Sequence, residues 1–308
     1  MSKLWVESHR PSTLDGYVFA DQAQKETIEG WVKEKSIPQV LLSGGPGCGK
    51  TTLAKILVNL LEVDPFDFME INASRENGID TIRDKITNFV QTMPFGDFKV
   101  VLLDEFDFCT PNAQASMRHM MEAYHQTARF ILTCNYPHKI IPAIHSRCQG
   151  FHIDKLDATE FTARVATVLV EEGVDFDLDT LDNYVRSTYP DLRKCLNNLQ
   201  MNSTGGKLIS PRENDRSSSD WKLSAVELFK SGKPTEARKL ICSSARQDEM
   251  EEIFRWCYDN LDLWTTDVYK QDEAIIIIRN GLVNVPFISD QEINLSATLV
   301  ELAQLTRS

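Results

Sequence analysis

The chain has 308 residues, 42% hydrophobic and 25% charged, which excludes a disordered protein and leaves room for two or three domains. A net charge of −12, half of it beyond residue 212, excludes a surface coated with nucleic acid, so any DNA contact should be local and lie in the first two thirds. Because there is no bilayer-length apolar run, no secretory signal and no CxxC among seven cysteines, we expect a soluble cytoplasmic protein without membrane, disulfide or zinc chemistry.

Residues 1–153 alternate between strand and helix patterns. Apolar runs bounded by turn residues are typical of buried strands, and leucine and isoleucine at helical spacing follow them. This alternation predicts an α/β fold with a parallel sheet covered by helices on both faces. The expected strands are 40–43, 100–103 and 129–133, and the expected helices are 51–61, 79–91 and 112–124.

The rest of the chain is predicted to be helical, with one interruption. A small helical domain should occupy residues 154–205. Glycine, serine and charged residues then predict a linker at 206–219, and apolar stripes predict a second all-helical domain at 220–308. We find no internal repeat.

The segment Gly44–Thr51 matches the G-x4-G-K-[ST] phosphate-binding pattern in full, between a predicted strand and a predicted helix. Its glycines let backbone N–H groups approach phosphate oxygens, and the helix N-terminus adds positive potential. Lys50 would neutralise the β and γ phosphates, and the Thr51 hydroxyl would bind Mg²⁺. The sequence therefore predicts ATP and Mg²⁺ as cofactors.

Two carboxylates follow the strand at 100–103. Asp104 would hold Mg²⁺, largely through water, and Glu105 would activate the attacking water. Solvated acids at the end of a strand are the alternative. Asn135 ends the next strand, where it could hold that water or be a turn residue. Arg147 and Arg193 could add positive charge at the γ-phosphate, but their spacing fits surface salt bridges equally well.

Several short segments identify a family. Trp5–Pro11 (WVESHRP) resembles the amino-terminal W-V-E-K-Y-R-P box of replication factor C small subunits, with Ser8 and His9 replacing Lys and Tyr. Cys134–Tyr136 and Ile140–Cys148 resemble the sensor-1 and Ser-Arg-Cys segments of the same clamp-loader branch of the AAA+ ATPases. The phrases at 104–107, 121–124 and 189–194, and the absence of a cysteine-rich insertion, are most similar to loaders of T4-like bacteriophages.

This resemblance implies a RecA-like ATPase domain, a helical lid domain and a helical collar that holds a pentameric ring with one distinct subunit. Asn135 would be sensor 1, Arg147 a finger acting in trans on a neighbour's ATP, and Arg193 sensor 2 acting in cis. Lys50, Asp104 and Glu105 complete the catalytic set. The implied ATP-binding residues are Val6, Glu7, Ser8, His9, Val18, Gly47, Cys48, Gly49, Lys50, Thr51, Thr52 and Arg193.

The resemblance also implies partners: a sliding clamp, primer–template DNA, other loader subunits and, indirectly, a replicative polymerase. Ile79 and Arg83 would contact DNA phosphates. Gln114 would couple DNA contact to Glu105. An apolar set could dock the clamp or belong to the core: Phe89, Val90, Met93, Pro94, Phe95 and Phe98.

Three alternatives to a hydrolysing loader subunit remain open. One is another AAA+ motor, such as a helicase loader or a branch-migration motor. The Trp5–Pro11 box and the Ser-Arg-Cys motif argue against it. A non-hydrolysing structural subunit would not need an intact Lys50, Asp104, Glu105 and Asn135. A small-molecule P-loop kinase fits the long helical tail poorly.

Overall fold

The computed structural model describes residues 4–75, 79–153, 156–209, 221–244, 250–265, 267–285, 287–288 and 290–305. The chain forms two compact units. The first contains Met1–Glu172 and Pro190–Gln200, and the second contains Gly173–Tyr189 and Met201–Ser308. The predicted three-domain division stays a prediction.

The first unit is built on a five-stranded parallel sheet in the order β2-β3-β4-β1-β5. The three expected strands are confirmed, whereas the two edge strands were missed. Both edge strands are only partly buried, so neither shows a continuous apolar run. The strands are β1 Val40–Ser43, β2 Phe68–Asn72, β3 Lys99–Asp104, β4 Ala128–Cys134 and β5 Gln149–His152.

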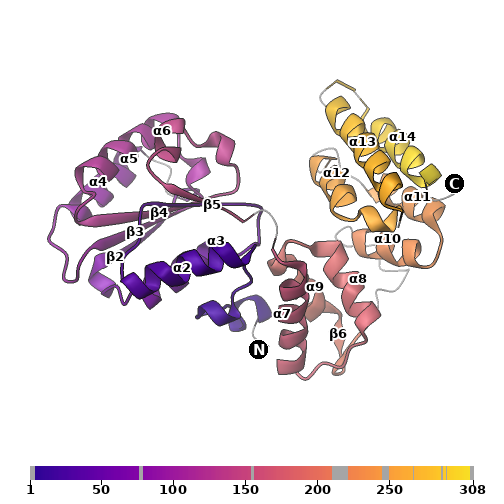
Figure 1. Cartoon of the computed structure of the whole chain (residues 1–308), viewed down its shortest axis with the longest axis horizontal. Helices are drawn as coiled ribbons and strands as arrows, with labels where there is room; N and C mark the ends of the chain where they lie inside the picture. Colours follow the sequence, from indigo (N-terminus) through magenta and orange to yellow (C-terminus); the bar gives the residue numbers. More distant parts are fainter. Residues whose placement is uncertain are drawn as a thin grey trace. The chain divides into compact units, whose positions relative to one another are not determined.

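Helices cover both faces of this sheet, as the sequence predicted (Figure 1). Helices α2 and α3 lie on one face, and α4, α5 and α6 lie on the other. Apolar side chains of β1, β3 and β4 form a buried core with α4 and α5. The helices of this unit are α1 Trp5–Ser8, α2 Gln22–Glu34, α3 Lys50–Leu60, α4 Ile79–Val90, α5 Pro111–Ala123, α6 Pro142–His145, α7 Ala158–Glu171 and, up to Gln200, α9 Leu192–Asn202.

The second unit is mostly helical and has a core of its own around Phe254 and Trp264. A two-stranded antiparallel hairpin, β6 Ser203–Thr204 and β7 Lys207–Leu208, crosses the boundary between the predicted helical domain and the predicted linker. Two-residue strands are too short to produce a periodic pattern. The helices are α8 Leu178–Thr188, α10 Trp221–Lys230, α11 Pro234–Ser244, α12 Met250–Asp259, α13 Val268–Asn284 and α14 Gln291–Leu305.

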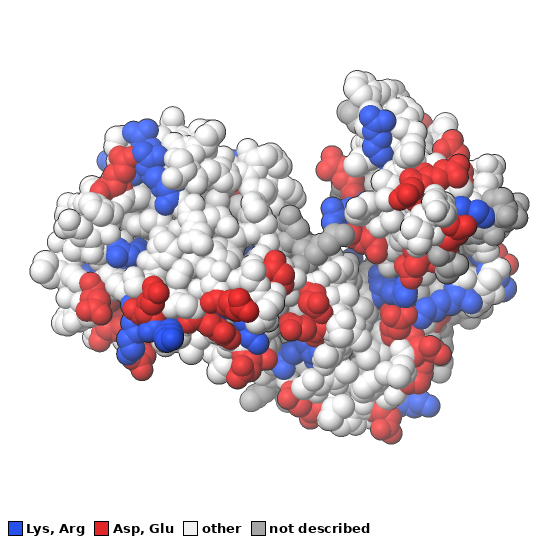
Figure 2. Space-filling model, in the orientation of Figure 1, with Lys and Arg blue, Asp and Glu red and all other residues white. Residues whose placement is uncertain are grey.

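The surface is not uniformly basic. On the face drawn in Figure 2, acidic and basic side chains are interspersed and broad areas carry neither. A patch that binds DNA on this face would therefore have to be small, in agreement with the net charge of −12. Among the described helices, none is long and apolar enough to cross a membrane.

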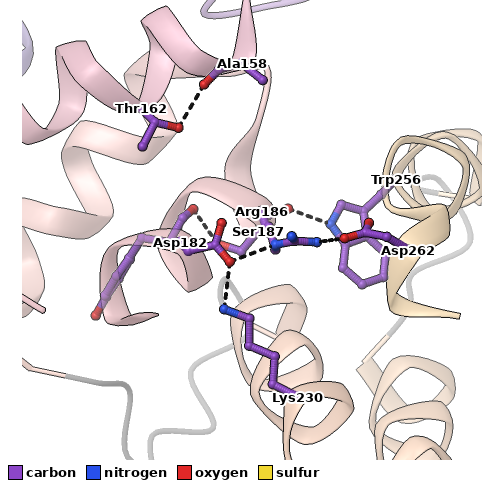
Figure 3. Close-up of polar contacts among 9 residues, drawn as sticks. Ala158, Thr162, Asp182, Arg186, Ser187, Lys230, Trp256 and Asp262 are labelled. Carbon is purple, nitrogen blue, oxygen red and sulfur yellow. Dashed lines mark hydrogen bonds and ion pairs between the residues drawn. The ribbon is translucent and has the colours of Figure 1, made fainter. Parts of the chain in front are cut away.

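A polar cluster joins α8 to α10 and to the 3₁₀ turn Leu261–Leu263 (Figure 3). The Arg186 guanidinium donates to Asp182 at 2.8 Å and to Asp262. Lys230 Nζ donates to the same Asp182 oxygen at 2.7 Å. Trp256 Nε1 donates to the Arg186 carbonyl at 3.1 Å. Each charged group in this cluster therefore faces an opposite charge.

Candidate ATPase site

The phosphate loop connects β1 to α3 at the carboxyl edge of the sheet. Gly47 has a φ of +72°, a conformation that favours glycine. A Cβ at this position would lie 1.7 Å from Asp191 Oδ1, so a larger residue would force the Asp191 carboxylate to move. The Asp191 carboxylate caps α9 by accepting from Lys194 N at 2.9 Å. Burial raises the pKa of Asp191, because a carboxylate is poorly solvated against the loop.

Lys50 is buried at the start of α3, with 8% of its surface exposed. Its Nζ donates to the carbonyls of Gly44 at 2.8 Å and Gly45 at 2.6 Å. No carboxylate forms an ion pair with Lys50 in the part of the chain that the structure describes. A buried ammonium ion without a counter-charge is costly, and a phosphate would supply that charge.

Hydroxyls and a carboxylate meet at the ends of β3 and β4. Asp104 Oδ1 accepts from Thr51 Oγ1 at 2.6 Å and from Thr133 Oγ1 at 2.7 Å. Thr133 Oγ1 also accepts from Glu105 N at 3.0 Å. Glu105 has a φ of +57°, which is unusual for a residue with a side chain. The Asp104 carboxylate thus contacts the last residue of the phosphate loop, and the Glu105 backbone follows it directly.

A pocket opens next to the phosphate loop, within the first unit. It contains eight of the predicted ATP-binding residues, together with apolar side chains that could contact a base. Glu7, Ser8, Lys50 and Thr51 are not part of its lining, and the assignment of all twelve residues to ATP stays a prediction. The lining residues are Val6, His9, Arg10, Pro11, Gly16, Tyr17, Val18, Gly47, Cys48, Gly49, Thr52, Leu156, Arg164, Leu192, Arg193 and Leu196.

The amino-terminal box is tied to α7, which forms one side of this pocket. The ring nitrogens of His9 lie 3.0 Å from a Glu171 oxygen and 2.5 Å from a Glu172 oxygen. Arg164 Nη2 donates to the His9 carbonyl at 2.7 Å. Trp5 N donates to Gln200 Oε1 at 3.0 Å. These contacts hold the predicted adenine-side residues in place.

Asn135 lies directly after β4, at the same edge as Asp104 and Glu105. Its backbone N–H donates to Asp107 Oδ2 at 3.3 Å, and that of Tyr136 donates to the same oxygen at 3.2 Å. Asp107 is buried, so it fixes the backbone of the sensor-1 segment from within.

The two predicted arginines differ in their surroundings. Arg193 is exposed and belongs to the pocket lining, on the same side as Gly47. Arg147 is half-buried and is held by Glu122, to which it donates from Nε at 2.7 Å and also from Nη2. The hydrogen bond from Arg147 lowers the pKa of the exposed Glu122. Arg147 is not part of the pocket lining in its own chain.

Gln114 is buried, and its amide is fully hydrogen-bonded. The amide donates to the carbonyls of Cys109 at 3.1 Å and Lys139 at 3.0 Å and accepts from Ile141 N at 2.8 Å. It therefore bridges the loop after Glu105 to the loop before α6. Arg83 is exposed on α4, and its Nε lies 3.6 Å from Asp84 Oδ1. Ile79 begins α4, and its side chain lies outside the described residues.

Four contributors were missed by sequence reasoning: Thr133, Asp107, Asp191 and Arg164. A threonine within an apolar strand reads as one more strand residue, because the pattern does not show which hydroxyl meets a carboxylate. Asp191 precedes a helix and carried a capping signal, but its contact with Gly47 joins residues far apart in sequence. Only three-dimensional proximity identifies these roles.

The residues fit ATP and Mg²⁺. Lys50 is buried without a counter-charge, and Gly47 leaves no Cβ in front of the loop. Thr51 donates its proton to Asp104, which leaves the lone pairs of its hydroxyl for a cation. Lys50 and the loop amides would hold the phosphates, and Thr51 and Asp104 would hold Mg²⁺, which neutralises developing charge when bound.

The comparisons with known proteins agree with this site. The "ATPase family associated with various cellular activities (AAA)" matches residues 40–154, which include the phosphate loop, both carboxylates and Asn135. A solved RuvB Holliday junction branch migration motor from Thermotoga maritima has a TM-score of 0.55 and 16% identity, with 72% of this chain and 73% of that chain covered. A variant of RuvB from the same organism has a TM-score of 0.55 and 15% identity, with the same shares of the two chains covered. At these identities the likeness shows the fold alone. The fold and site therefore define an AAA+ ATPase.

Curated relatives narrow the class. The replication factor C small subunit of Methanococcus vannielii is 37% identical, over 99% of this chain and 100% of its own. The replication factor C small subunit of Sulfurisphaera tokodaii is 36% identical, over 97% of this chain and 95% of its own. The chain belongs to the replication factor C small subunit family of clamp-loader ATPases, as the Trp5–Pro11 and Ser-Arg-Cys segments predicted.

Proposed function

We propose that this chain is an ATP-hydrolysing subunit of a clamp loader, which helps to open a ring-shaped sliding clamp and to place it on primer–template DNA. The observation that carries hydrolysis is the junction at Thr51, Asp104 and Glu105, which stands beside a phosphate loop with a buried, uncompensated Lys50. A non-hydrolysing structural subunit would not require it. Loading rests on family membership.

The mechanism follows from what each group can do. Lys50 and the loop amides bind the β and γ phosphates, and Thr51 and Asp104 bind Mg²⁺. Glu105 accepts a proton from the attacking water, and the Asn135 amide orients that water without titrating. Arg193, in the pocket lining, reaches the γ-phosphate in cis. The pocket residues of the amino-terminal box bind the adenosine.

Arg147 acts in trans, on ATP held by a neighbouring subunit of a pentameric ring that contains one distinct subunit. In its own chain the Arg147 guanidinium contacts Glu122, Ala143 and Ser146, none of which belongs to the phosphate loop, and this supports the role. Gln114 couples DNA contact to Glu105, and its amide, which bridges the loop that follows Glu105 to the loop that precedes α6, supports this role. Arg83, exposed on α4, contacts DNA phosphates together with Ile79 at the start of that helix.

The apolar set predicted for clamp or core divides into two groups. Val90 is buried, and Phe89, Pro94 and Phe98 are partly buried. Met93 and Phe95 are 83% and 78% exposed, so these two are the proposed clamp contacts. The loop that presents them is fixed, because Asp67 Oδ2 accepts from Phe95 N at 2.7 Å and Gly96 N at 2.8 Å. A replicative polymerase would meet this chain only indirectly, through the loaded clamp.

The resemblance of the segments at 104–107, 121–124 and 189–194 to T4-like phage loaders supports a phage origin, with action in the host cytoplasm.

The decisive experiment measures ATP turnover by the assembled loader with clamp alone, primed DNA alone, and both. We expect stimulation by both together to exceed the sum of the separate effects. Glu105→Gln should keep ATP binding and lose turnover, since an amide cannot accept the proton. An absence of synergy would leave a general AAA+ motor, and unchanged turnover in Glu105→Gln would remove that residue from the mechanism.

The role of Arg147 in trans has a separate test. Arg147→Ala protein is mixed with Glu105→Gln protein, and each variant alone should form inactive rings. A site is complete where an Arg147→Ala subunit, which keeps its own Glu105, receives the arginine of a Glu105→Gln neighbour, so mixed rings should regain part of the ATP turnover. No regained turnover in mixed rings would contradict the trans assignment.

A further inference from the structure

We propose that Thr133 is a positioning residue of the ATPase site, whose hydroxyl fixes Asp104 and Glu105 relative to each other. This inference rests on the proposed roles of those two carboxylates. The Thr133 hydroxyl has one proton to donate, which goes to Asp104 Oδ1 at 2.7 Å. It accepts from the backbone N–H of Glu105 at 3.0 Å. One side-chain oxygen thus contacts both residues of the acidic pair.

The sheet brings Thr133 to this point. In the β3–β4 pair, Leu103 lies opposite Leu132, so Thr133 stands one step further along, beside the residue at which β3 ends. On the other side of β4, Leu42 of β1 lies opposite Thr133, two residues before the phosphate loop begins. Thr133 is therefore next to both the acidic pair and the loop, and its exposed fraction is 1%.

The hydroxyl matters because the Glu105 backbone is strained. A residue with a side chain at a φ of +57° and a ψ of 44° occupies a sparsely populated, unfavourable region of backbone conformation. Such a conformation persists only where neighbouring contacts enforce it. The bond from Glu105 N to Thr133 is one such contact, and it sets the direction in which the Glu105 carboxylate leaves the strand.

The same hydroxyl also shares Asp104 with the cation-binding residue. Asp104 Oδ1 accepts from Thr51 Oγ1 and from Thr133 Oγ1, so the carboxylate is held from two sides. Without Thr133, Asp104 would keep only the contact with Thr51. We therefore expect the loss of Thr133 to disturb turnover through Glu105 and to weaken the response to Mg²⁺ through Asp104.

The test compares Thr133→Val, which has the same shape without the hydroxyl, with Thr133→Ser, which keeps it. In the assembled loader with clamp and primed DNA, Thr133→Val should lower kcat by about 10- to 100-fold, because small displacements of catalytic groups have effects of this size. Binding of a fluorescent ATP analogue without Mg²⁺ should change less than about twofold, since Lys50 and the loop are untouched. Thr133→Ser should restore turnover.

A second readout does not depend on activity. Amide hydrogen exchange in a peptide that contains Glu105 should become faster in Thr133→Val, since that N–H loses its acceptor, and remain slow in Thr133→Ser. Thr298→Val is the matched control. Its buried hydroxyl donates to the Asn294 carbonyl at 3.0 Å in the second unit, and its replacement should leave turnover unchanged.

The outcomes separate the two ideas. Normal kcat in Thr133→Val, with or without faster exchange at Glu105, would overturn the positioning role even if Glu105→Gln is inactive. An active Glu105→Gln would overturn the proposed base instead. If Thr133→Val does not fold, Thr133→Ala serves as the second variant without the hydroxyl. Turnover in that variant equal to wild type would also contradict the proposal.

Discussion

The molecule contains two polar clusters whose charges are arranged in opposite ways. Around Arg186 in the second unit, two carboxylates and two cations pair with one another (Figure 3). At the phosphate loop, Lys50 contacts only carbonyls and a thiol, and Asp104 accepts only from hydroxyls. No ion pair joins these two residues to an opposite charge within the described chain.

This difference separates a structural cluster from a site. Charges that are neutralised inside the chain stabilise the fold and have little left to offer a ligand. Charges left without partners cost stability until a ligand of opposite sign arrives, and such groups concentrate at functional sites. Mutations in the Arg186 cluster should therefore change the free energy of unfolding, and mutations at the phosphate-loop site should change the affinity for ATP.

The largest effect is expected from Lys50→Met. Removing the ammonium should weaken ATP binding by about 100-fold, or roughly 3 kcal/mol, because a charge-assisted contact with phosphate is lost. The free energy of unfolding should not fall, since a buried uncompensated charge is replaced by an apolar chain of similar length. Titration with a fluorescent ATP analogue and urea unfolding measure the two quantities. A clear fall in the free energy of unfolding with unchanged ATP affinity would mean that Lys50 stabilises the fold and does not bind the nucleotide.

Arg186→Met should give the opposite pattern. The guanidinium joins Asp182 and Asp262, so its loss should lower the free energy of unfolding by about 1 to 2 kcal/mol, the moderate value expected of half-exposed pairs. ATP affinity should stay within about twofold. Lys233→Met is the control, because the pair that Lys233 forms with Glu236 is more exposed and should contribute about half as much or less. Weaker ATP binding in Arg186→Met would show that the cluster is not purely structural.

Asp191→Asn tests an acid that lies against Gly47 of the phosphate loop. Asparagine caps a helix as well as aspartate does, so α9 should keep its start. Removal of a negative charge beside Gly47 should tighten ATP binding by about 3- to 10-fold, because it no longer repels the phosphates. Isothermal titration measures the change. Weaker binding would mean that Asp191 helps the nucleotide, through Arg193 or through the loop, rather than opposing it.

The sequence predicted the parts of this molecule that local pattern controls. The strand at 40–43, the phosphate loop and the carboxylates at 104 and 105 each follow from a short stretch of residues. The edge strands β2 and β5 escaped because they are partly exposed, so their apolar pattern is weak. Thr133 and Asp191 escaped for another reason, since their importance comes from contacts with residues 29 positions away and further. Spacing along the chain carries no record of such contacts.

The smallest expected effect concerns how folding stability changes as pH falls. For Asp182 and for Asp191, the wild-type chain is compared with the variant that has asparagine at that position. Burial raises the pKa of Asp182, but hydrogen bonds from Lys230 and Arg186 outweigh it and hold the pKa below its usual value. Its stabilising effect is therefore present above the unfolded pKa, near 3.9, and is lost as pH falls through the lower folded value. Asp191 has a raised pKa, so its destabilising effect is present above the folded pKa and disappears as pH falls through it.

Unfolding midpoints of the full chain between about pH 7 and pH 3 should show both signs. At neutral pH, Asp182→Asn should be less stable than wild type and Asp191→Asn more stable. Both differences should shrink on acidification, that of Asp191 first, because its folded pKa is the higher of the two. If the Asp182→Asn variant reached the wild-type midpoint before the Asp191→Asn variant did, Asp191, and not Asp182, would be the carboxylate with a charged partner in the folded chain.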